Sequence, residues 1–220
     1  MSKVELKIDW ASHEAAKYAC EHWHYSKCLP VGKLVKVGAW ENGKYIGVVL
    51  FGRGANRNMG SKFGLGQDKC VELVRVALTK HISPVSKICA LAIRYLKAQS
   101  SELELIVSYA DPEQNHHGGI YQAMNWTYTG VSSTAKKIWY KGKWTHKKTI
   151  DDLGIPQANL PVKIAVGKHT YIYPMSKAMA ERIVKLAKPY PKRHKQAESG
   201  PPEMRRCDTD HDAPITREAV

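Results

Sequence analysis

The middle of the chain, residues 70–109, reads CVELVRVALTKHISPVSKICALAIRYLKAQSSELELIVSY. Residues 70–78 are mostly apolar, which is typical of a strand buried on both faces. Ser83-Pro84 is a typical helix start, with serine as the cap and proline in the first turn. An apolar stripe carries this helix to about Gln99, and residues 103–109 form a second buried strand. This order of elements predicts a mixed sheet with helices packed against it.

Shorter elements flank this centre. The turn at Asn42-Gly43 is the signal of a tight β-hairpin and would join strands over residues 34–40 and 45–51. A second hairpin is expected over residues 162–173, with its turn at Gly167-Lys168. The other expected elements are helices at 12–22, 119–124 and 177–186, strands at 126–131 and 138–140, and a further strand after a turn at 141–143.

The positive charge of the chain lies in its expected folded body. The 220 residues carry a formal net charge of +14. Residues 191–220 contain as many basic as acidic side chains, so residues 1–190 carry the whole excess. We expect residues 1–190 to form one domain and residues 191–220 a disordered tail. A compact basic body predicts a polyanionic partner, usually nucleic acid, with a purely solubilising charge as the alternative.

Composition also indicates the cellular compartment of the protein. No apolar stretch approaches the roughly 18–20 residues of a membrane span, and the first residues lack the apolar region of a signal peptide. The five cysteines are scattered without a paired C-x-x-C, which favours reduced thiols. We therefore expect a cytoplasmic protein with no membrane partner.

The element order resembles the GNAT acyltransferase fold over about residues 5–150, including Gly118, Tyr121 and Trp126 near its end. This resemblance implies an α/β (α+β) fold with a GNAT-like mixed, largely antiparallel central sheet and helices on both faces. GNAT enzymes hold the coenzyme A pyrophosphate in a glycine-rich loop before the central helix. Residues 79–87 contain no glycine, which disfavours acetyl-CoA as the donor.

The identity of the group donor therefore stays open. The free N–H groups at the start of the central helix still offer a site for an anionic or polar donor. The side chains expected at this donor site are Lys80, Ser83, Ser86 and Lys87.

Four separated blocks give a finer resemblance, to the Mom DNA-modification proteins of Mu-like phages. The blocks are His24–Lys27, Phe51–Ala55, Val71–Val76 and Ser108–Pro112, the last running on to His117-Gly118 and Ile120–Ala123. That family is understood to install a carbamoylmethyl group on the exocyclic amine of adenine, which protects DNA from restriction. The resemblance implies a transferase of this kind, with duplex DNA and a small-group donor as its partners, in the host cytoplasm if it is phage-encoded.

An adenine amine is a poor nucleophile, so its enzyme must position it, accept its proton and hold the electrophile. Asp111, which follows a buried strand, is the expected base or acceptor for the amine. His24 and Tyr25 could exchange protons or stabilise developing charge. The complete predicted catalytic set is His24, Tyr25, Ser26, Arg75, Ser108, Asp111 and Tyr121.

Arg75 and Tyr121 have specific expected roles. Arg75 would hold a carboxylate, phosphate or carbonyl, and in a regular strand it would face away from Glu72. Tyr121 falls where GNAT enzymes often carry the acid for the leaving group. The structural alternatives are a buried ion pair for Arg75, a core position for Tyr121 and a turn-forming role for Asp111.

Asp111, His116 and His117, with His24, also suggest a divalent metal. Adjacent histidines rarely bind one ion together, and the spacing matches no standard signature. We therefore assign no metal ligand.

Residues 136–148, KKIWYKGKWTHKK, contain six lysines, three aromatic residues and no acid. Lysines bind phosphates, and aromatic rings stack on bases or wedge between them. Modification of a base amine requires the base to leave the duplex. The alternative is a solvated hairpin whose aromatic side chains face the core. The expected DNA contacts are Arg53, Arg57, Lys136, Lys137, Lys141, Lys143, Lys147 and Lys148.

Two other functions compete with this one. The first is a conventional acetyltransferase acting on protein, tRNA or a small molecule, which tight acetyl-CoA binding would reveal. The second is a non-catalytic basic DNA-binding protein, which would bind DNA in a salt-dependent way and leave every base unmodified.

Overall fold

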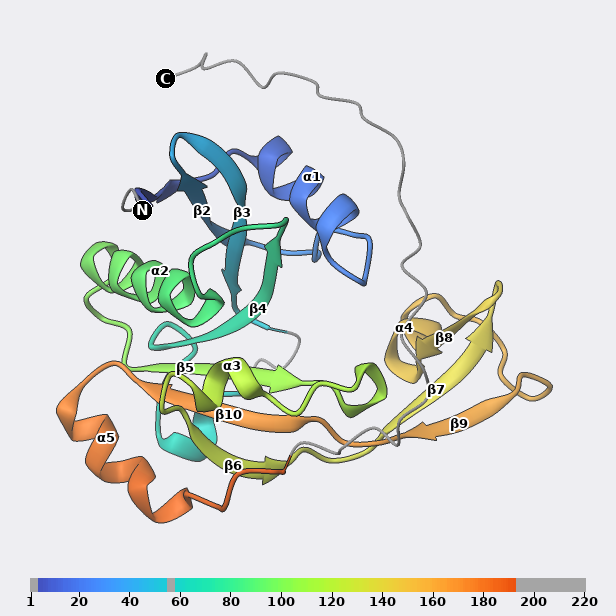
Figure 1. The fold of residues 1–220 in the computed structure, drawn as a ribbon. Helices are drawn as coiled ribbons and strands as arrows, with labels where there is room; N and C mark the ends of the chain where they lie inside the picture. The colour runs from blue at the N-terminus through green and yellow to red at the C-terminus, as the bar shows by residue number, and fades with distance from the viewer. Residues whose placement is uncertain (1–3, 55–57, 193–220) are drawn as a thin grey trace.

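A seven-stranded sheet forms the centre of the molecule in the computed structural model, which describes residues 4–54 and 58–192 (Figure 1). In spatial order its strands are β1 (Leu6–Trp10), β2 (Leu34–Glu41), β3 (Lys44–Gly52), β4 (Cys70–Leu78), β5 (Leu105–Ala110), β10 (His169–Pro174) and β6 (Thr127–Val131). The predicted DNA contact Arg57 and almost all of the predicted tail, from residue 193 on, lie outside the described residues.

The predicted Asn-Gly turn is confirmed. Asn42 and Gly43 both have positive φ, 49° and 79°, as a two-residue hairpin turn requires. The turn joins β2 to β3 with Glu41 opposite Lys44.

Helices cover both faces of the sheet, as the sequence predicts. On one face α2 (Val85–Gln99) buries Ile88, Ala92 and Leu96 in a core shared with residues of β2, β3, β4 and β5. On the other face α1 (His13–Trp23) packs on β3 and β4, and α5 (Lys177–Ile183) packs on β5 and β10. Figure 1 shows α1 and α2 on opposite sides of the β2–β4 strands. The mixed, largely antiparallel sheet with helices on both faces is therefore confirmed.

β4 and β5 are the one parallel pair among the described strands, and their pairing is short. Only Cys70, Val71 and Glu72 of β4 pair with β5, opposite Leu105, Ile106 and Val107. Beyond that point β4 stays hydrogen-bonded to β3 and β5 to β10. The two strands therefore separate and leave a gap in the middle of the sheet.

A β-bulge sits in β4 at the start of this gap. Leu50 of β3 pairs with Arg75 while Phe51 pairs with Leu73, so Val74 is an extra residue. Leu73 and Val76 consequently both pack on the α2 side. Glu72 and Arg75 then share the opposite face, and their predicted placement on different faces is wrong because the strand is not regular.

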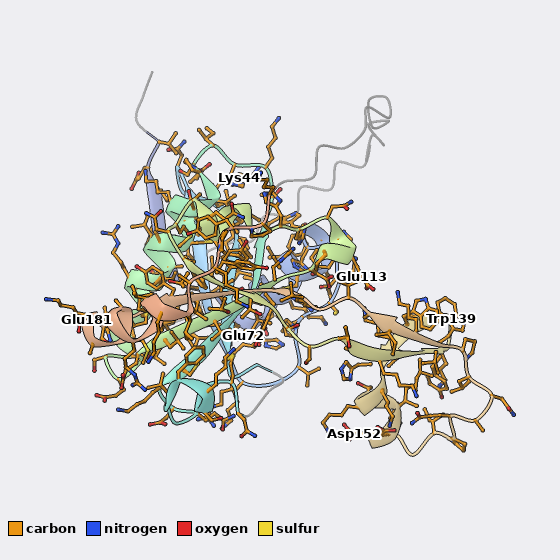
Figure 2. The ribbon with its side chains drawn as sticks, turned by 90° about the horizontal axis from the view of Figure 1, so that it is seen from below. Lys44, Glu72, Glu113, Trp139, Asp152 and Glu181 are labelled. Atoms are coloured by element: carbon orange, nitrogen blue, oxygen red, sulfur yellow. The ribbon has the colours of Figure 1, made fainter. Side chains whose placement is uncertain are left out.

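A smaller unit projects from the main sheet. Its three strands, in the order β8-β7-β9, are β8 (Lys143–His146), β7 (Ala135–Tyr140) and β9 (Val162–Ala165), and α4 (Lys147–Asp152) packs against them. Figures 1 and 2 show this unit standing apart from the seven-stranded sheet. The sequence pattern predicts β7 and β8 but gives no signal for α4.

The predicted hairpin over residues 162–173 is wrong. β9 pairs with β7, whereas β10 lies between β5 and β6 in the main sheet. Gly167 marks a close crossing instead of a hairpin turn, because a Cβ there would come 2.0 Å from the Ser132 carbonyl oxygen. Ser83 likewise does not cap α2, since Pro84 is its N-cap.

Gly118, the N-cap of the short helix α3 (Gly119–Gln122), should not tolerate a side chain. Its φ is 83°, and a Cβ would lie 2.2 Å from the buried ring of Tyr171. Strain and overlap together predict that Gly118→Ala lowers the free energy of unfolding by about 2–5 kcal/mol, measured by urea denaturation. The control is Gly142→Ala, where φ is 76° and no atom lies within 4 Å, so only about 1–2 kcal/mol should be lost. Equal losses in the two variants would contradict this account.

Candidate functional site

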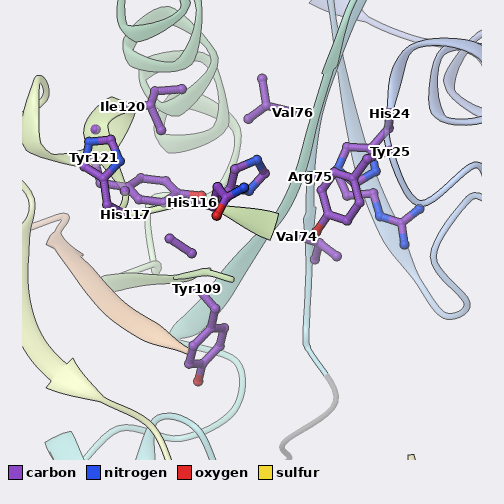
Figure 3. Close-up of a pocket in the computed structure, with 14 residues that line it drawn as sticks. His24, Tyr25, Val74, Arg75, Val76, Tyr109, His116, His117, Ile120 and Tyr121 are labelled. Atoms are coloured by element: carbon purple, nitrogen blue, oxygen red, sulfur yellow. The ribbon is translucent and has the colours of Figure 1, made fainter. Parts of the chain in front are cut away.

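A cavity of about 370 Å³ occupies the gap between β4 and β5 (Figure 3). Two of its walls are the strands themselves. The loop after α1 forms a third wall, and the segment after β5 forms the fourth. The lining side chains used below are His24, Tyr25, Arg75, Tyr109, His116, His117 and Tyr121.

Ser26 fixes the tautomer of His24. The Ser26 backbone N–H donates to His24 Nδ1 at 3.1 Å, and Ser26 Oγ lies 2.7 Å from the same nitrogen. Because a backbone N–H can only donate, Nδ1 is an acceptor and the ring proton is on Nε2. His24 lines the cavity, so its Nε2–H is the group it has left for a ligand.

His24 is uncharged at neutral pH. Burial, with the positive charge of Arg75 next in importance, lowers the pKa of this imidazole to about 4. A group that is already neutral, with its acceptor nitrogen occupied, is better suited to donating a hydrogen bond than to taking up a proton. The structure therefore favours His24 as a polarising donor over its expected role in proton exchange.

Arg75 brings a positive charge to the cavity. Its Nη1 and Nη2 each lie 3.8 Å from Cys28 Sγ, which is a weak acceptor. Within residues 4–54 and 58–192 no carboxylate forms a salt bridge with it, so the alternative of a buried ion pair is not seen. The guanidinium can therefore bind an anionic group or a carbonyl oxygen.

Ser108 and Tyr121 form a hydrogen-bonded chain across the gap. Ser108 Oγ lies 2.8 Å from the Leu73 carbonyl oxygen and 2.7 Å from the Tyr121 hydroxyl. The carbonyl can only accept, so Ser108 donates to Leu73 and Tyr121 donates to Ser108. Burial raises the pKa of Tyr121 far above its usual value, and the phenol keeps its proton.

Tyr25 and His116 form the outer rim of the cavity. The Tyr25 side chain is 53% exposed, and its ring lies 5.5 Å from that of His116 in an edge-on contact. His117 also lines the cavity, and its carbonyl oxygen accepts from the Gln122 side chain at 3.2 Å. Aromatic rings at an open rim could contact a flat ligand as it enters.

Asp111 lies outside the cavity lining. Its Oδ1 accepts from the Glu113 backbone N–H at 3.0 Å and caps the turn Pro112–Gln114. Its Oδ2 lies 3.2 Å from Lys168 Nζ. The first contact matches the turn-forming alternative, and the role of Asp111 as a base stays a prediction.

Glu72 is a further candidate that shares the face of β4 with Arg75, although like Asp111 it is not among the residues that line the cavity. Burial raises the pKa of its carboxyl to about 7, although the charge of Lys168 opposes the shift. No hydrogen bond from the described residues reaches this carboxylate. It packs under the backbone of Gly54, where a Cβ would lie 2.2 Å from Oε2. The available signal was a charged residue in an apolar strand, which must be satisfied or functional.

The predicted donor residues are not part of this cavity. The Glu41 carboxylate fills the loop before α2 and accepts from the backbone N–H groups of Ile82 at 2.8 Å and Ser83 at 2.6 Å. Lys80, Ser86 and Lys87 do not line the cavity either. A pyrophosphate at this loop would meet a carboxylate, so the loop does not fit coenzyme A.

Comparison with known proteins identifies the family. A family model described as the Mom protein family matches residues 5–192. The chain belongs to the Mom protein family. The relative named "Methylcarbamoylase mom", from Escherichia phage Mu, is 25% identical over 152 residues, covering 67% of this chain and 62% of the relative. The chain thus spans about three fifths of that relative's length, and the expected membership of the Mom family is confirmed.

Solved acetyltransferases resemble this Mom-family chain more distantly. A GNAT acetyltransferase from Streptococcus pneumoniae is 12% identical with a TM-score of 0.45, over 78% of this chain and 100% of that one. FeeM, an N-acyl amino acid synthase from uncultured soil microbes, is 11% identical with a TM-score of 0.46, over 80% of this chain and 92% of that one.

Acids neutralise half of the predicted DNA-binding lysines of this Mom-family chain. Lys137 pairs with Glu113 at 2.7 Å, and Lys147 and Lys148 pair with aspartates one helical turn later in α4. Three other predicted lysines form no salt bridge with the described residues: Lys136, Lys141 and Lys143. Such exposed pairs are worth about 0–1 kcal/mol each, so phosphate could displace them.

Arg53 lies elsewhere, beside a second cavity of about 520 Å³. Across residues 4–54 and 58–192, no three histidine, cysteine or acidic side chains gather as a metal site would require. No helix in the same part of the chain is long and apolar enough to span a membrane.

His24 should remain neutral throughout the working pH range. In ¹⁵N NMR spectra of the purified protein its ring should show the Nε2–H tautomer and titrate near pH 4. Arg75→Met should raise this pKa, because a neighbouring positive charge is removed. Arg94→Met, on the exposed side of α2, is the control and should leave it unchanged. A His24 that titrates above pH 6 would contradict the assignment.

Because of Glu72, the free energy of unfolding should fall as the pH rises. Its carboxyl has a pKa of about 4.5 when unfolded and about 7 when folded, so stability falls between these pH values. Glu72→Gln should abolish this fall, a relative gain of about 3 kcal/mol at pH 8 in urea denaturation. Glu102→Gln, at an exposed position, is the control and should follow wild type. Parallel curves for wild type and Glu72→Gln would refute the raised pKa.

Proposed function

We propose that this protein is a transferase that adds a small group to the exocyclic amine of adenine in duplex DNA. The observation that carries the proposal is the cavity between β4 and β5, where a neutral His24, a protonated Tyr121 and an Arg75 with no carboxylate partner among the described residues meet. Membership of the Mom family supports the same reaction class, because the phage Mu relative is named a methylcarbamoylase. By that resemblance the transferred group is carbamoylmethyl.

Two groups would hold the electrophilic end of the donor, one from a strand and one from a loop. Arg75 would bind a carboxylate, phosphate or carbonyl oxygen of the donor, and the Nε2–H of His24 would donate to a second oxygen. Neither group has to change its protonation state, so both can stabilise charge that develops during transfer. Tyr121, still protonated at neutral pH, would turn its O–H from Ser108 to the leaving group and give its proton there.

The amine would lose its proton to Glu72. A carboxyl with a pKa of about 7 is half ionised at neutral pH, which suits a general base. The N–C bond forms as the bond to the leaving group breaks, and the amine proton passes to the carboxylate. Asp111, the base expected from the sequence, would instead hold Lys168, whose charge limits the pKa of Glu72.

The product explains the biological use of the reaction. The exocyclic amine is the donor that adenine presents in the major groove, and a substituent on it blocks proteins that read that edge. The modified DNA would resist restriction enzymes.

Mass spectrometry of nucleosides tests this proposal. Plasmid DNA from cells expressing the full chain should contain a deoxyadenosine heavier by a carbamoylmethyl group in place of one hydrogen. Glu72→Gln should lower the modified fraction at least tenfold, whereas Asp111→Asn should lower it less. Abundant soluble protein with unmodified nucleosides would contradict the proposal, and acetylated protein, tRNA or amine products would favour an acetyltransferase.

The pH dependence of modification by purified protein should separate the two carboxylates. The rate should rise with pH to a plateau, with an apparent pKa of about 7, because Glu72 must be ionised. Asp111→Asn should retain that rise. If Glu72→Gln retains it as well, another group is the base.

A further inference from the structure

The projecting three-stranded sheet has one covered and one open face. Ile138 is fully buried, and its cross-strand neighbour Thr145 has a buried Oγ1. Both lie on the side that α4 covers through Ile150, which is also fully buried. Side chains alternate along a strand, so the neighbours of Ile138 point to the other face.

Two tryptophans stand on that open face. Trp139 of β7 and Trp144 of β8 are directly opposite each other, and their ring centroids are 5.3 Å apart in an edge-on contact. Their side chains are 40% and 38% exposed. Figure 2 shows Trp139 on one side of this sheet and Asp152, at the end of α4, on the other. For these two tryptophans, the alternative that the aromatic side chains face the core of the unit is therefore wrong.

Positive charge borders the tryptophan pair. Lys163 Nζ lies 5.2 Å from the Trp144 ring centroid, as in a cation–π contact. Lys137 and Lys163 are opposite each other on the same open face, and both bind Glu113, so two lysines share one acid. Residues 132–168 carry eight lysines and two aspartates, which favours an anionic partner with flat apolar parts.

The open face is attached to the wall of the cavity. Glu113, which holds Lys137 and Lys163, lies in the turn Pro112–Gln114. The chain runs directly from this turn into residues 115–121, which line the cavity. A ligand lying on the tryptophans would therefore continue towards the opening in which the modified group must sit.

We propose that the open face formed by Trp139, Trp144, Lys137 and Lys163 binds duplex DNA, with the two indoles stacking on bases beside the extruded adenine. This inference rests on the proposed function. The lysines contact phosphates, and the indoles replace stacking that the neighbouring bases lose when adenine leaves the helix. An anionic membrane surface is disfavoured, because the apolar part of this face is a single pair of rings.

Binding of a fluorescently labelled adenine-containing duplex to the purified full chain tests the inference by anisotropy. Trp139→Ala and Trp144→Ala should each raise the dissociation constant about 5- to 150-fold, which is the effect of losing one stacked base. Trp139→Phe and Trp144→Phe, which keep a ring, should recover most of the affinity. The matched control is Trp10→Ala, since Trp10 is 46% exposed on β1 at the far edge of the main sheet. Circular dichroism should confirm that every variant is folded.

The outcomes separate this inference from the proposed function. If the two alanine variants lose duplex binding while wild type leaves nucleosides unmodified, the interface is supported and the adenine reaction is rejected. If wild type modifies nucleosides while both alanine variants bind the duplex as wild type does, the reaction is supported and the interface is overturned. Tryptophan-dependent binding to vesicles of anionic lipid, with none to the duplex, would also overturn it.

Discussion

β4 and β5 stop pairing after three residues, and the cavity exists because of that interruption. Val74 adds a residue to β4 at the point where the strands part. Just beyond the last paired residues, the Ser108 hydroxyl donates a hydrogen bond to the Leu73 carbonyl, in place of a backbone hydrogen bond between the strands. The same bulge turns Arg75 onto the face that carries Glu72, His24 and α1. One local irregularity therefore opens the sheet and supplies the cavity with its cation.

The electrostatics of the site follow from burial more than from paired charges. Burial disfavours the charged form of each group. It keeps His24 neutral and Tyr121 protonated, and it raises the pKa of Glu72 to about 7. Arg75 keeps its charge because a guanidinium does not lose its proton in proteins. The folded chain tolerates a buried carboxyl, with no hydrogen bond from the described residues, in its central strand at the expense of stability. This pattern is common where residues are kept for function.

Local signals in the sequence were enough for most of the main sheet. The apolar run at Cys70–Leu78, the Asn42-Gly43 turn and the stripe of α2 each depend on neighbouring residues, and each was predicted within a few positions. β10 was misassigned because its partners, β5 and β6, are set by the tertiary fold and not by the adjacent Gly167. The bulge at Val74 has no local signal, since valine is as common in regular strands.

The residues of the candidate site also differ in how far local sequence signals predict them. His24, Arg75 and Tyr121 were predicted from family blocks and do meet in one cavity. Asp111 was chosen because it follows a strand, but its side chain is used by its own turn and by Lys168. Glu41, distant in sequence from α2, occupies the loop proposed for the donor, which no local pattern could reveal.

The three-stranded unit is an elaborated connection between two neighbouring strands. β6 ends at Val131 and β10 begins at His169, directly opposite each other, and the chain closes between them where the Ser132 N–H donates to the Lys168 carbonyl at 2.8 Å. Everything from residue 133 to residue 167 leaves and re-enters the main sheet through this narrow neck. Such a module can be lengthened, shortened or exchanged between homologues while the sheet keeps its register. Evolution can therefore change the surface that this unit presents without altering the cavity between β4 and β5.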